Sequence, residues 1–339
     1  MKVGILAFSE TGLALGKRLA EYFAAKADDA SVTRCEDGGL AAWTELHFAS
    51  DEALIFIGSA GLAVRAIAPY LKSKTTDPAV VVVDELKTYS ISLLSGHLGG
   101  ANGLAVEIAR VLGAIPVVTT ATDLHGVFAV DTWAKKQGLM IANPERIKWV
   151  SSRLLAGETI MLKSKFPVEG ELPIGIELAE DSGDILVTYR ARGNAGALRL
   201  VPSVVTLGVG CKKDTDAEII ENAFSLTLAK ASCHPAAVKR VCSIDLKANE
   251  PGILEFCLRH ALPYRTFSAK ELAAVPGKFR GSAFVKSVTG VDNVCERSAV
   301  LGSGEGGKLL TQKDAGYGVT MAFAIEPYVL RFDEGGRTE

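Results

Sequence analysis

Residues 93–120, LLSGHLGGANGLAVEIARVLGAIPVVTT, decide the fold of the first third of the chain. A β-rich run ends near Ser95, and glycines then allow a tight turn. An apolar pattern with helical spacing begins near Ala101 or Asn102, and a second β-rich run follows from Ala114. Strand, glycine turn, helix and strand together predict one unit of an α/β sheet.

The same alternation extends on both sides of this unit. β-rich runs at Val3 (VGILAF) and Ala53 (ALIFIGS) each precede a helical pattern, and AIPVVTT precedes one that holds AVDTWAKKQG. Near-continuous apolar strands separated by helices predict a mostly parallel sheet covered on both faces. AVVVVDELKTYSISLLS, from Ala79, holds two β-rich runs with few polar residues between them, which predicts a hairpin and a partly mixed sheet.

The rest of the chain divides into a less regular middle and a second regular region. Residues 143–202 contain one helical pattern (PERIKWVSSRLLAG) and two β-rich runs, and the α/β alternation returns from Ser203. We therefore expect an α/β protein. We expect two α/β domains with mostly parallel, partly mixed sheets, residues 1–142 and 203–332. A small α+β linking domain, residues 143–202, should join them, and a polar tail, residues 333–339, should follow.

Composition excludes several classes of protein. Of 339 residues 48% are hydrophobic and 22% are charged, so large cores can form and disorder is not expected. A net charge of −2 gives no electrostatic reason to expect nucleic acid or an anionic membrane as a partner. MKVGILAFSE is better explained as a first strand than as a signal peptide, and no apolar run approaches the roughly 20 residues of a membrane span. We expect a cytoplasmic protein.

The six cysteines are scattered and form no CxxC pair. This pattern fits reduced thiols, and it offers no ligand spacing typical of zinc. We expect no metal site and no cofactor held by the protein itself.

The glycines of the opening stretch match no nucleotide-binding motif. They stand at positions 96, 99, 100 and 103, which is neither GxGxxG nor GxxxxGK[ST]. A turn into a helix still leaves N–H groups that favour an anion, a carboxylate as readily as a phosphate. We expect Ser95, Gly99, Gly100 and Asn102 to line such a site and His97 to lie beside it, at the end of the sheet where open α/β folds bind ligands. The alternative, that His97 only packs against the turn, stays open.

GSAGLAVRAIAPYLKSK, from Gly58, contains a second strand-to-helix turn. Ser59 and Gly61 offer another cradle for a carboxylate or an oxyanion. Arg65 suits bidentate carboxylate binding and Lys74 supplies a point charge. Because Arg65 stands in an otherwise apolar helix, we expect it to have a specific partner, whereas Lys72 fits a solvated helix face.

Acidic and hydroxyl side chains follow two further strands. Thr120, Thr122 and Asp123 stand where AIPVV ends, and Asp84 follows VVVV. Two acids near a histidine can serve as a general base and its orienter. Asp and Thr are also ordinary turn and cap residues, which is the alternative for each of them.

The C-terminal region offers weaker candidates. GVGCKKDTDAE places Cys211 and Lys212 just before a helix, so Cys211 is either a thiolate nucleophile or a structural thiol. TGVDNVCERSAVLGSGEGGKLL adds a glycine-rich turn with Glu296 and Lys308 nearby. SGEGG lacks the context of a phosphate loop.

In combination these stretches resemble a known family. GSAGLAVRAIAPYLKSKTTDPAVVVVDE and ISLLSGHLGGANGLAVEIARVLGAIPVVTTATD are similar to the N-terminal region of cobalt-precorrin-5A hydrolases, the CbiG family of anaerobic cobalamin (vitamin B12) biosynthesis. LGVGCKKDTDAEII, SIDLKANEPGI, TGVDNVCE and KLLTQKDAGYGVTMAFA resemble its C-terminal domain, and the middle matches only in position. One departure is that LKTYS, after Val-Asp-Glu, lacks the expected turn glycine.

The resemblance implies a reaction. The family opens the δ-lactone of cobalt-precorrin-5A and releases acetaldehyde, giving cobalt-precorrin-5B during contraction of the tetrapyrrole to a corrin. The implied substrate is a small-molecule tetrapyrrole that carries many carboxylates and brings its own cobalt. The rival interpretations are a non-catalytic corrinoid-binding protein and a nucleotide-binding α/β enzyme. The interpretation leaves room for a homodimer and for a transient handover to other cobalamin-pathway enzymes.

Our hypothesis for the mechanism assigns roles to the candidate residues. His97 is the general base, oriented by Asp123 or Asp84, and N–H groups around Gly99 and Gly100 bind the oxyanion. The cations expected to contact substrate carboxylates are Arg65, Lys74 and Lys212. The remaining expected substrate contacts are Ser59, Gly61, Ser95, Asn102, Thr120 and Thr122.

Overall fold

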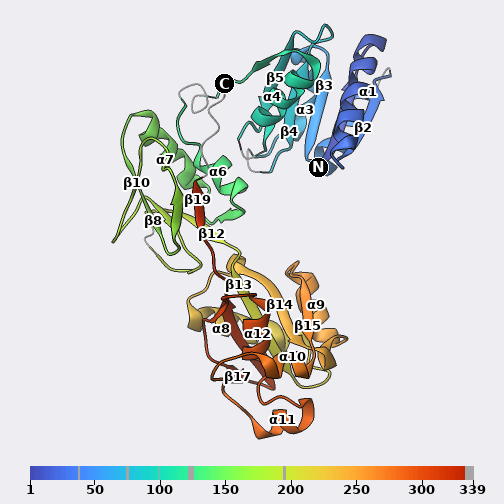
Figure 1. Cartoon of the computed structure of the whole chain (residues 1–339). Helices are drawn as coiled ribbons and strands as arrows, with labels where there is room; N and C mark the ends of the chain where they lie inside the picture. Colours follow the sequence, from blue (N-terminus) through green and yellow to red (C-terminus); the bar gives the residue numbers. More distant parts are fainter. Residues whose placement is uncertain (37–38, 74–75, 98, 121–125, 194–195, 333–339) are drawn as a thin grey trace. The chain divides into compact units, whose positions relative to one another are not determined.

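The computed structural model describes residues 1–36, 39–73, 76–97, 99–120, 126–193 and 196–332 (Figure 1). The chain divides into two compact units, Met1–Lys135 and Lys136–Glu339, and each is described by itself. Both units combine helices with mostly parallel sheets, which confirms the predicted α/β class.

The first unit is an open six-stranded sheet with helices on both faces. Its elements are β1 (Lys2–Ala7), α1 (Glu10–Ala25), β2 (Asp29–Arg34), α2 (Gly39–Ser50), β3 (Ala53–Ile57), α3 (Ala60–Ile67), β4 (Ala79–Val83), β5 (Tyr89–Leu94), α4 (Ala101–Leu112), β6 (Ile115–Val117) and α6 (Val130–Lys136). The strands lie in the order β2-β1-β3-β4-β5-β6, and every neighbouring pair is parallel except β4 and β5.

Two hydrophobic cores cover the faces of this sheet. Leu19 and Phe23 of α1 lie with Ile108 of α4 on one face. Trp43 of α2 and Ile67 of α3 lie on the other. Burying each large apolar side chain contributes about 1.5–3 kcal/mol, so helices on both faces are needed to cover strands that are apolar on both sides.

β4 and β5 form the predicted hairpin without a glycine. Val83 pairs with Ser90 and Val80 with Leu94 in an antiparallel ladder. Lys87 takes the left-handed conformation at φ 54° that a glycine normally supplies. Two bonds stabilise the turn, Lys87 N–H to the Asp84 carbonyl at 2.8 Å and Tyr89 N–H to Asp84 Oδ1 at 2.9 Å. A left-handed L-residue costs roughly 1–2 kcal/mol, which these bonds offset.

The hairpin determines which strand ends share an edge of the sheet. Because β5 runs against β4, the carboxyl ends of β5 and β6 reach the edge at which β1, β3 and β4 begin. Ser95 Oγ donates a 3.0 Å bond to the carbonyl of Asp77, just before β4. The carboxyl ends of β1, β3 and β4 therefore lie at the opposite edge.

The second unit contains two larger sheets and a short strand pair. Its first elements are β7 (Leu139–Ile141), α7 (Glu145–Leu155), β8 (Ile160–Ser164), β9 (Val168–Gly170), β10 (Ile176–Leu178), β11 (Ile185–Val187) and β12 (Leu198–Pro202). They form a sheet of order β10-β8-β11-β12-β7, in which β7 is antiparallel to β12 and the other pairs are parallel. β9 pairs instead with β19 (Leu330–Phe332), the last described strand.

The C-terminal sheet of this unit has the order β15-β14-β13-β18-β16, with β17 on β18. Its elements are β13 (Val205–Cys211), α8 (Ala217–Ala231), β14 (Val238–Ile244), α9 (Pro251–Arg259), β15 (Tyr264–Phe267), α10 (Ala269–Ala274), α11 (Ala283–Thr289), α12 (Cys295–Gly302), β16 (Lys308–Leu309), β17 (Asp314–Gly316) and β18 (Val319–Ile325). β13, β14 and β15 are parallel, and β18 is antiparallel to β13, β16 and β17.

α12 packs very close to β13. A Cβ at Gly208 would collide with the carbonyl group of Cys295, so only glycine lets the first turn of α12 approach the strand. Gly208 of LGVGC thus serves close packing.

Candidate functional site

The glycine turn before α4 satisfies three of its own amides. Gly100, at φ 90°, is the residue that precedes the helix. Its N–H donates to the His97 carbonyl at 3.0 Å, and the N–H groups of Ala101 and Asn102 donate to the carbonyls of Ser95 and Gly96. An oxyanion needs open donors. This corrects the hypothesis for Gly100, whose N–H is occupied by the turn.

Two of the residues predicted at this edge, Asn102 and Thr120, contact each other. Ser92 Oγ donates to Asn102 Oδ1 at 2.6 Å, and Asn102 Nδ2 donates to Thr120 Oγ1 at 2.9 Å. This chain of bonds connects β5, α4 and the segment after β6. Asn102 is 9% exposed, and its amide is engaged with two protein hydroxyls. We call Ser92, Ser95, His97, Asn102 and Thr120 the glycine-turn edge.

His97 is partly buried at the glycine-turn edge. Its Nδ1 lies 3.5 Å from Thr132 Oγ1 of α6. Asp123, its expected orienter, lies outside the described residues, as do Thr122 and Lys74.

The opposite edge of the sheet holds a pocket. It is a shallow, open pocket with a volume of about 370 Å³, and it is lined by Phe8, Gly58, Ser59, Leu62, Asp84 and Glu85. These residues follow the carboxyl ends of β1, β3 and β4, where open α/β sheets bind ligands. We call this set the hairpin edge.

The N-terminus of α3 opens at the hairpin edge. Ser59 precedes the helix in an extended conformation, and its hydroxyl makes no capping bond. Within the described residues the N–H groups of Ala60 and Gly61 have no hydrogen-bond partner. α1 differs, because Ser9 Oγ accepts from Gly12 N–H at 3.1 Å. Uncapped helix amides attract an anion.

Arg65 adds a cation beside these amides. It is exposed, and its Nη1 lies 3.9 Å from where a Cβ on Gly61 would be. In the described part of the chain Arg65 makes no ion pair or hydrogen bond, so the specific partner expected for it is not among those residues. Guanidinium and open amides together form a site for a carboxylate or an oxyanion.

Asp84 and His97 lie at different edges. Asp84 follows the carboxyl end of β4. The turn that carries His97 lies near the other end of β4, because Ser95 in this turn is hydrogen-bonded to Asp77, which precedes β4. A five-residue strand spans roughly 16 Å. This corrects the hypothesis that Asp84 orients His97, because a direct hydrogen bond between them requires contact.

In the second unit the thiol of Cys211 is poorly suited to nucleophilic attack. Burial raises the pKa of Cys211, while the charge of nearby Lys247 opposes this rise. A raised pKa leaves the group as a neutral thiol near pH 7. Lys212, next in the chain, is exposed, and its Cδ lies 3.1 Å from where a Cβ on Gly318 would be.

A cluster around the buried Asp51, at the C-terminal end of α2, was not singled out from the sequence. Asp51 accepts hydrogen bonds from His47 at 2.5 Å, Ser50 at 2.7 Å and Lys2 at 2.9 Å, and Trp43 stacks on the His47 ring. Burial opposes ionisation of Asp51, but the bonds from His47, Lys2 and Ser50 outweigh it and hold the pKa below its usual range. Trp43, His47 and Asp51 stand at i, i+4 spacing, which is the signal that identifies the cluster.

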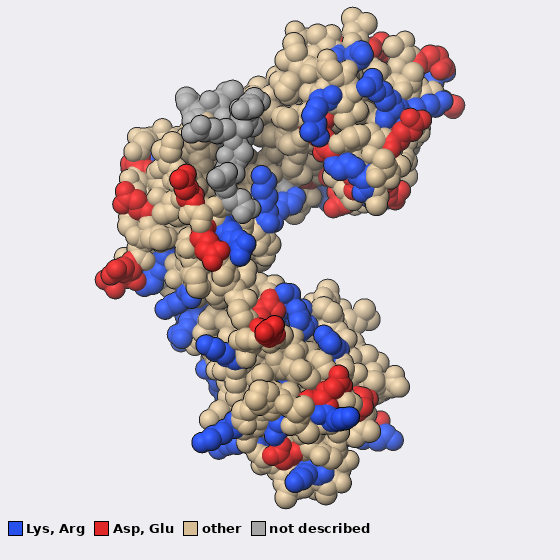
Figure 2. All heavy atoms as spheres, viewed as in Figure 1, with Lys and Arg blue, Asp and Glu red and all other residues tan. Residues whose placement is uncertain are grey.

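The surface carries charges of both signs. Figure 2 shows Lys and Arg interspersed with Asp and Glu on the visible face. Across the described residues no group of three or more His, Cys, Asp or Glu side chains is arranged to hold a metal ion. In the same part of the chain no helix is long and apolar enough to cross a membrane.

An open α/β sheet with a pocket of apolar and polar side chains beyond its strand ends is typical of enzymes and binding proteins for small molecules. Comparison with known proteins identifies the family. Models described as Cobalamin synthesis G N-terminal, Cobalamin biosynthesis central region and Cobalamin synthesis G C-terminus match residues 42–123, 128–202 and 205–324. The chain belongs to this cobalamin synthesis G (CbiG) family.

Two relatives share the name cobalt-precorrin-5A hydrolase. The protein of Salmonella typhimurium is 33% identical over 343 residues, which cover 95% of this chain and 97% of the relative. The protein of Priestia megaterium is 36% identical over 303 residues, or 83% of this chain and 80% of the relative. A solved structure titled as a cobalamin biosynthesis protein G homolog from Sulfolobus solfataricus is 23% identical, covers 96% of this chain and 97% of its own, and has a TM-score of 0.43.

Proposed function

We propose that this chain is a hydrolase of cobalamin biosynthesis that acts on cobalt-precorrin-5A. The observation that carries the proposal is the similarity to a cobalt-precorrin-5A hydrolase over 95% of this chain. In the proposed reaction water adds to the carbonyl of the δ-lactone, the ring C–O bond breaks, and the freed alkoxide takes a proton. Deprotonation of that alcohol then lets the adjacent carbon–carbon bond break, releasing acetaldehyde while the macrocycle carbon takes up a proton.

The reacting lactone fits the hairpin edge best. Lactone opening requires donors for the oxyanion and a group that activates water. The open amides of Ala60 and Gly61 supply the donors. The carboxylate of Asp84 lines the same pocket as Ser59 and is our candidate for the general base. Arg65 is our candidate for holding a substrate carboxylate beside them.

His97 supports a second candidate site at the glycine-turn edge. An imidazole is the side chain most often used as a general base near neutral pH. With Asp123 as its orienter and the Gly99 amide as a donor, His97 would activate water there. Ser95, Asn102, Thr120 and Thr122 would line that site. The two edges cannot hold the same lactone, so variants at Asp84 and His97 discriminate between them.

Anaerobic incubation with cobalt-precorrin-5A, followed by measurement of acetaldehyde, tests the function. Release of acetaldehyde with formation of cobalt-precorrin-5B supports it. Tight binding of the substrate without acetaldehyde indicates a corrinoid-binding protein instead. A thermal shift with ATP or NAD and none with a corrinoid indicates a nucleotide-binding enzyme.

The remaining expectations are proposals that follow from this function. Cobalt belongs to the substrate, so the reaction is assigned no resident cofactor. Lys74 and Lys212 are further candidates for substrate carboxylates. A cytoplasmic location, a homodimer and a handover to other pathway enzymes are consistent with a biosynthetic enzyme of this family.

A further inference from the structure

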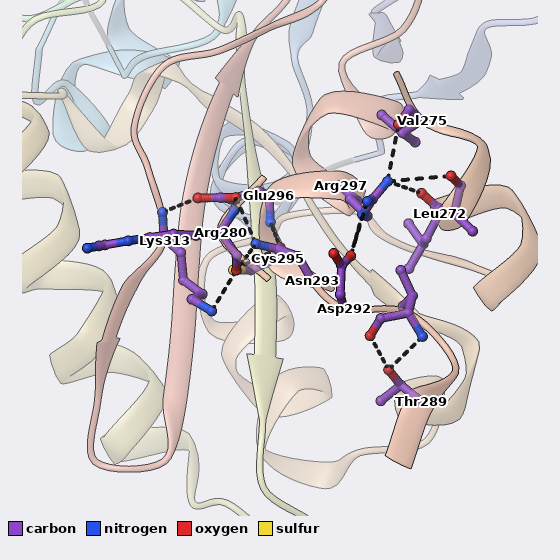
Figure 3. A network of polar contacts seen from close by, with 12 residues as sticks. Leu272, Val275, Arg280, Thr289, Asp292, Asn293, Cys295, Glu296, Arg297 and Lys313 are labelled. Atoms are coloured by element: carbon purple, nitrogen blue, oxygen red, sulfur yellow. Dashed lines mark hydrogen bonds and ion pairs between the residues drawn. The ribbon is translucent and has the colours of Figure 1, made fainter. Parts of the chain in front are cut away.

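A buried carboxylate at the start of α12 holds two surface loops. Glu296 is 1% exposed. Its Oε2 accepts from Arg280 N–H at 2.8 Å and from Asn293 Nδ2 at 2.7 Å, and its Oε1 accepts from Lys313 N–H at 2.6 Å (Figure 3). One side chain therefore fixes the backbone of residues far apart in sequence.

The neighbouring Arg297 fixes the other end of the first loop. Its Nη1 donates to the carbonyls of Val275 at 3.1 Å and Leu272 at 3.2 Å (Figure 3). Its guanidinium lies 4.6 Å from the centre of the Phe279 ring. Asp292 balances the Arg297 charge at 3.0 Å. Residues 275–280 are thus held at both ends by α12.

This held loop presents cations without anionic partners. Lys278 and Arg280 are exposed, and neither side chain makes an ion pair or hydrogen bond with the described residues. Lys313 Nζ donates to the Arg280 carbonyl at 2.9 Å, which places a third cation beside them and leaves the ammonium further donors. Two carboxylates that contact this region are already engaged, Glu296 by amides and Asp292 by Arg297.

Burial of the Glu296 carboxylate costs free energy, which suggests that the ordered loop serves a function. Burying a carboxylate is unfavourable and is tolerated only where several donors compensate it. A surface loop does not need such a clamp to be accommodated, whereas a binding loop does, because recognition requires groups fixed by a rigid scaffold. Here Glu296 and Arg297, which we call the clamp, order the backbone of a loop that carries the unpaired cations Lys278 and Arg280.

We propose that Lys278, Arg280 and Lys313 form a binding site for the carboxylate side chains of an anionic macrocycle, and that Glu296 is its positioning residue. The identity of the macrocycle rests on the proposed function, and the site itself rests on the contacts above. Arg280 offers a bidentate fork and the two lysines offer point charges, which suits several carboxylates on a flexible periphery.

Binding of cobyrinic acid, which carries free acetate and propionate groups, tests the site without turnover. Its fully methyl-esterified form is the neutral control ligand. The K278Q/R280Q double variant should weaken cobyrinic acid binding roughly tenfold at low salt, with less effect at high salt and none on the ester. The control variant is Lys286→Gln, which changes an exposed lysine on α11 outside the proposed site. It should bind cobyrinic acid as tightly as the original protein does.

Glu296→Gln tests the positioning role. It keeps the shape of the side chain but removes its charge, and it should weaken cobyrinic acid binding and raise KM for cobalt-precorrin-5A with little change in kcat. A lower Tm with unchanged Kd and KM would make Glu296 purely structural. If Glu296→Gln does not fold, the K278Q/R280Q variant still tests the binding site, because it changes exposed side chains and should fold normally.

Two results would overturn the proposal. One is equal binding of cobyrinic acid by the original protein and the double variant. The other is no binding of cobyrinic acid by a preparation that hydrolyses cobalt-precorrin-5A. Charge-selective binding by a preparation that releases no acetaldehyde would instead uphold this site and contradict the proposed hydrolase.

Discussion

Ser95 Oγ donates a hydrogen bond to the carbonyl of Asp77 at 3.0 Å, which attaches the carboxyl end of β5 to the residues that precede β4. This contact places the glycine turn at the edge where the parallel strands begin. The pocket with Ser59 and Asp84 lies at the edge where they end. Residues that stand in similar strand–turn–helix contexts in the sequence therefore form two separate candidate sites.

Asp84→Asn and His97→Ala distinguish these sites. If the lactone reacts at the hairpin edge, Asp84→Asn should lower kcat about 10²–10⁴-fold, the usual contribution of general acid–base catalysis. Asn can still accept the Tyr89 N–H bond, so the hairpin should persist. His97→Ala should then stay within about threefold of the original activity. The rate of acetaldehyde release measures the activity of both variants. A large loss of activity in His97→Ala together with a small loss in Asp84→Asn would instead place the reaction at the glycine-turn edge.

Arg65→Gln should raise KM for cobalt-precorrin-5A, because it removes an unpaired cation beside the open amides of α3. A charge-assisted bond of this kind corresponds to about 1.5–3 kcal/mol, or roughly 10–150-fold in KM. Lys72→Gln, at an exposed lysine nearby, should leave KM unchanged. An unchanged KM in Arg65→Gln at low salt would remove Arg65 from the substrate site.

Asp51 should make stability depend on acid pH. Its pKa in the folded protein is lowered, so it contributes stability that is present above its unfolded value, about 3.9, and is lost as pH falls through the folded value. Asp51→Asn should lower the free energy of unfolding at pH 7 by about 2–4 kcal/mol, because it leaves His47 and Lys2 beside an uncharged group. Urea unfolding measured from pH 7 to pH 3 should show that the difference in the free energy of unfolding between the original protein and Asp51→Asn becomes smaller as the pH falls. The Glu45→Gln variant, changed at an exposed residue of the preceding helix α2, should show the same pH dependence of stability as the original protein.

Cys211 should be dispensable for turnover. Burial raises its pKa, so the thiolate is a minor species at neutral pH and alkylation by iodoacetamide should be slow and accelerate as pH increases. Cys211→Ser should keep kcat within about threefold, with correct folding confirmed by circular dichroism. A loss of 100-fold or more in a folded variant would restore Cys211 as a nucleophile.

Local pattern was sufficient for the secondary structure around the candidate sites. The start of α4 at Ala101, the end of β5 at Leu94 and the β4–β5 hairpin all follow from apolar spacing and turn residues that are close in sequence. The hairpin forms even though Lys87 stands in place of the expected glycine, because two N–H groups donate hydrogen bonds to Asp84 and hold the turn. Glu296 and Lys313 are different, since their contact joins residues that no periodicity relates.

The sequence by itself determined the α/β class, the glycine turns and membership of the cobalamin synthesis G family, because periodicity and motif identity are properties of neighbouring residues. Only the tertiary structure decided that Asp84 and His97 stand at opposite edges, that the Gly100 amide is occupied, and that Glu296 holds the cation-bearing loop. The physical reason is that strand direction, hydrogen-bond occupancy and burial of a carboxylate depend on which distant segments pair. These long-range pairings fix the position of each candidate group, and they are absent from any single stretch of the chain.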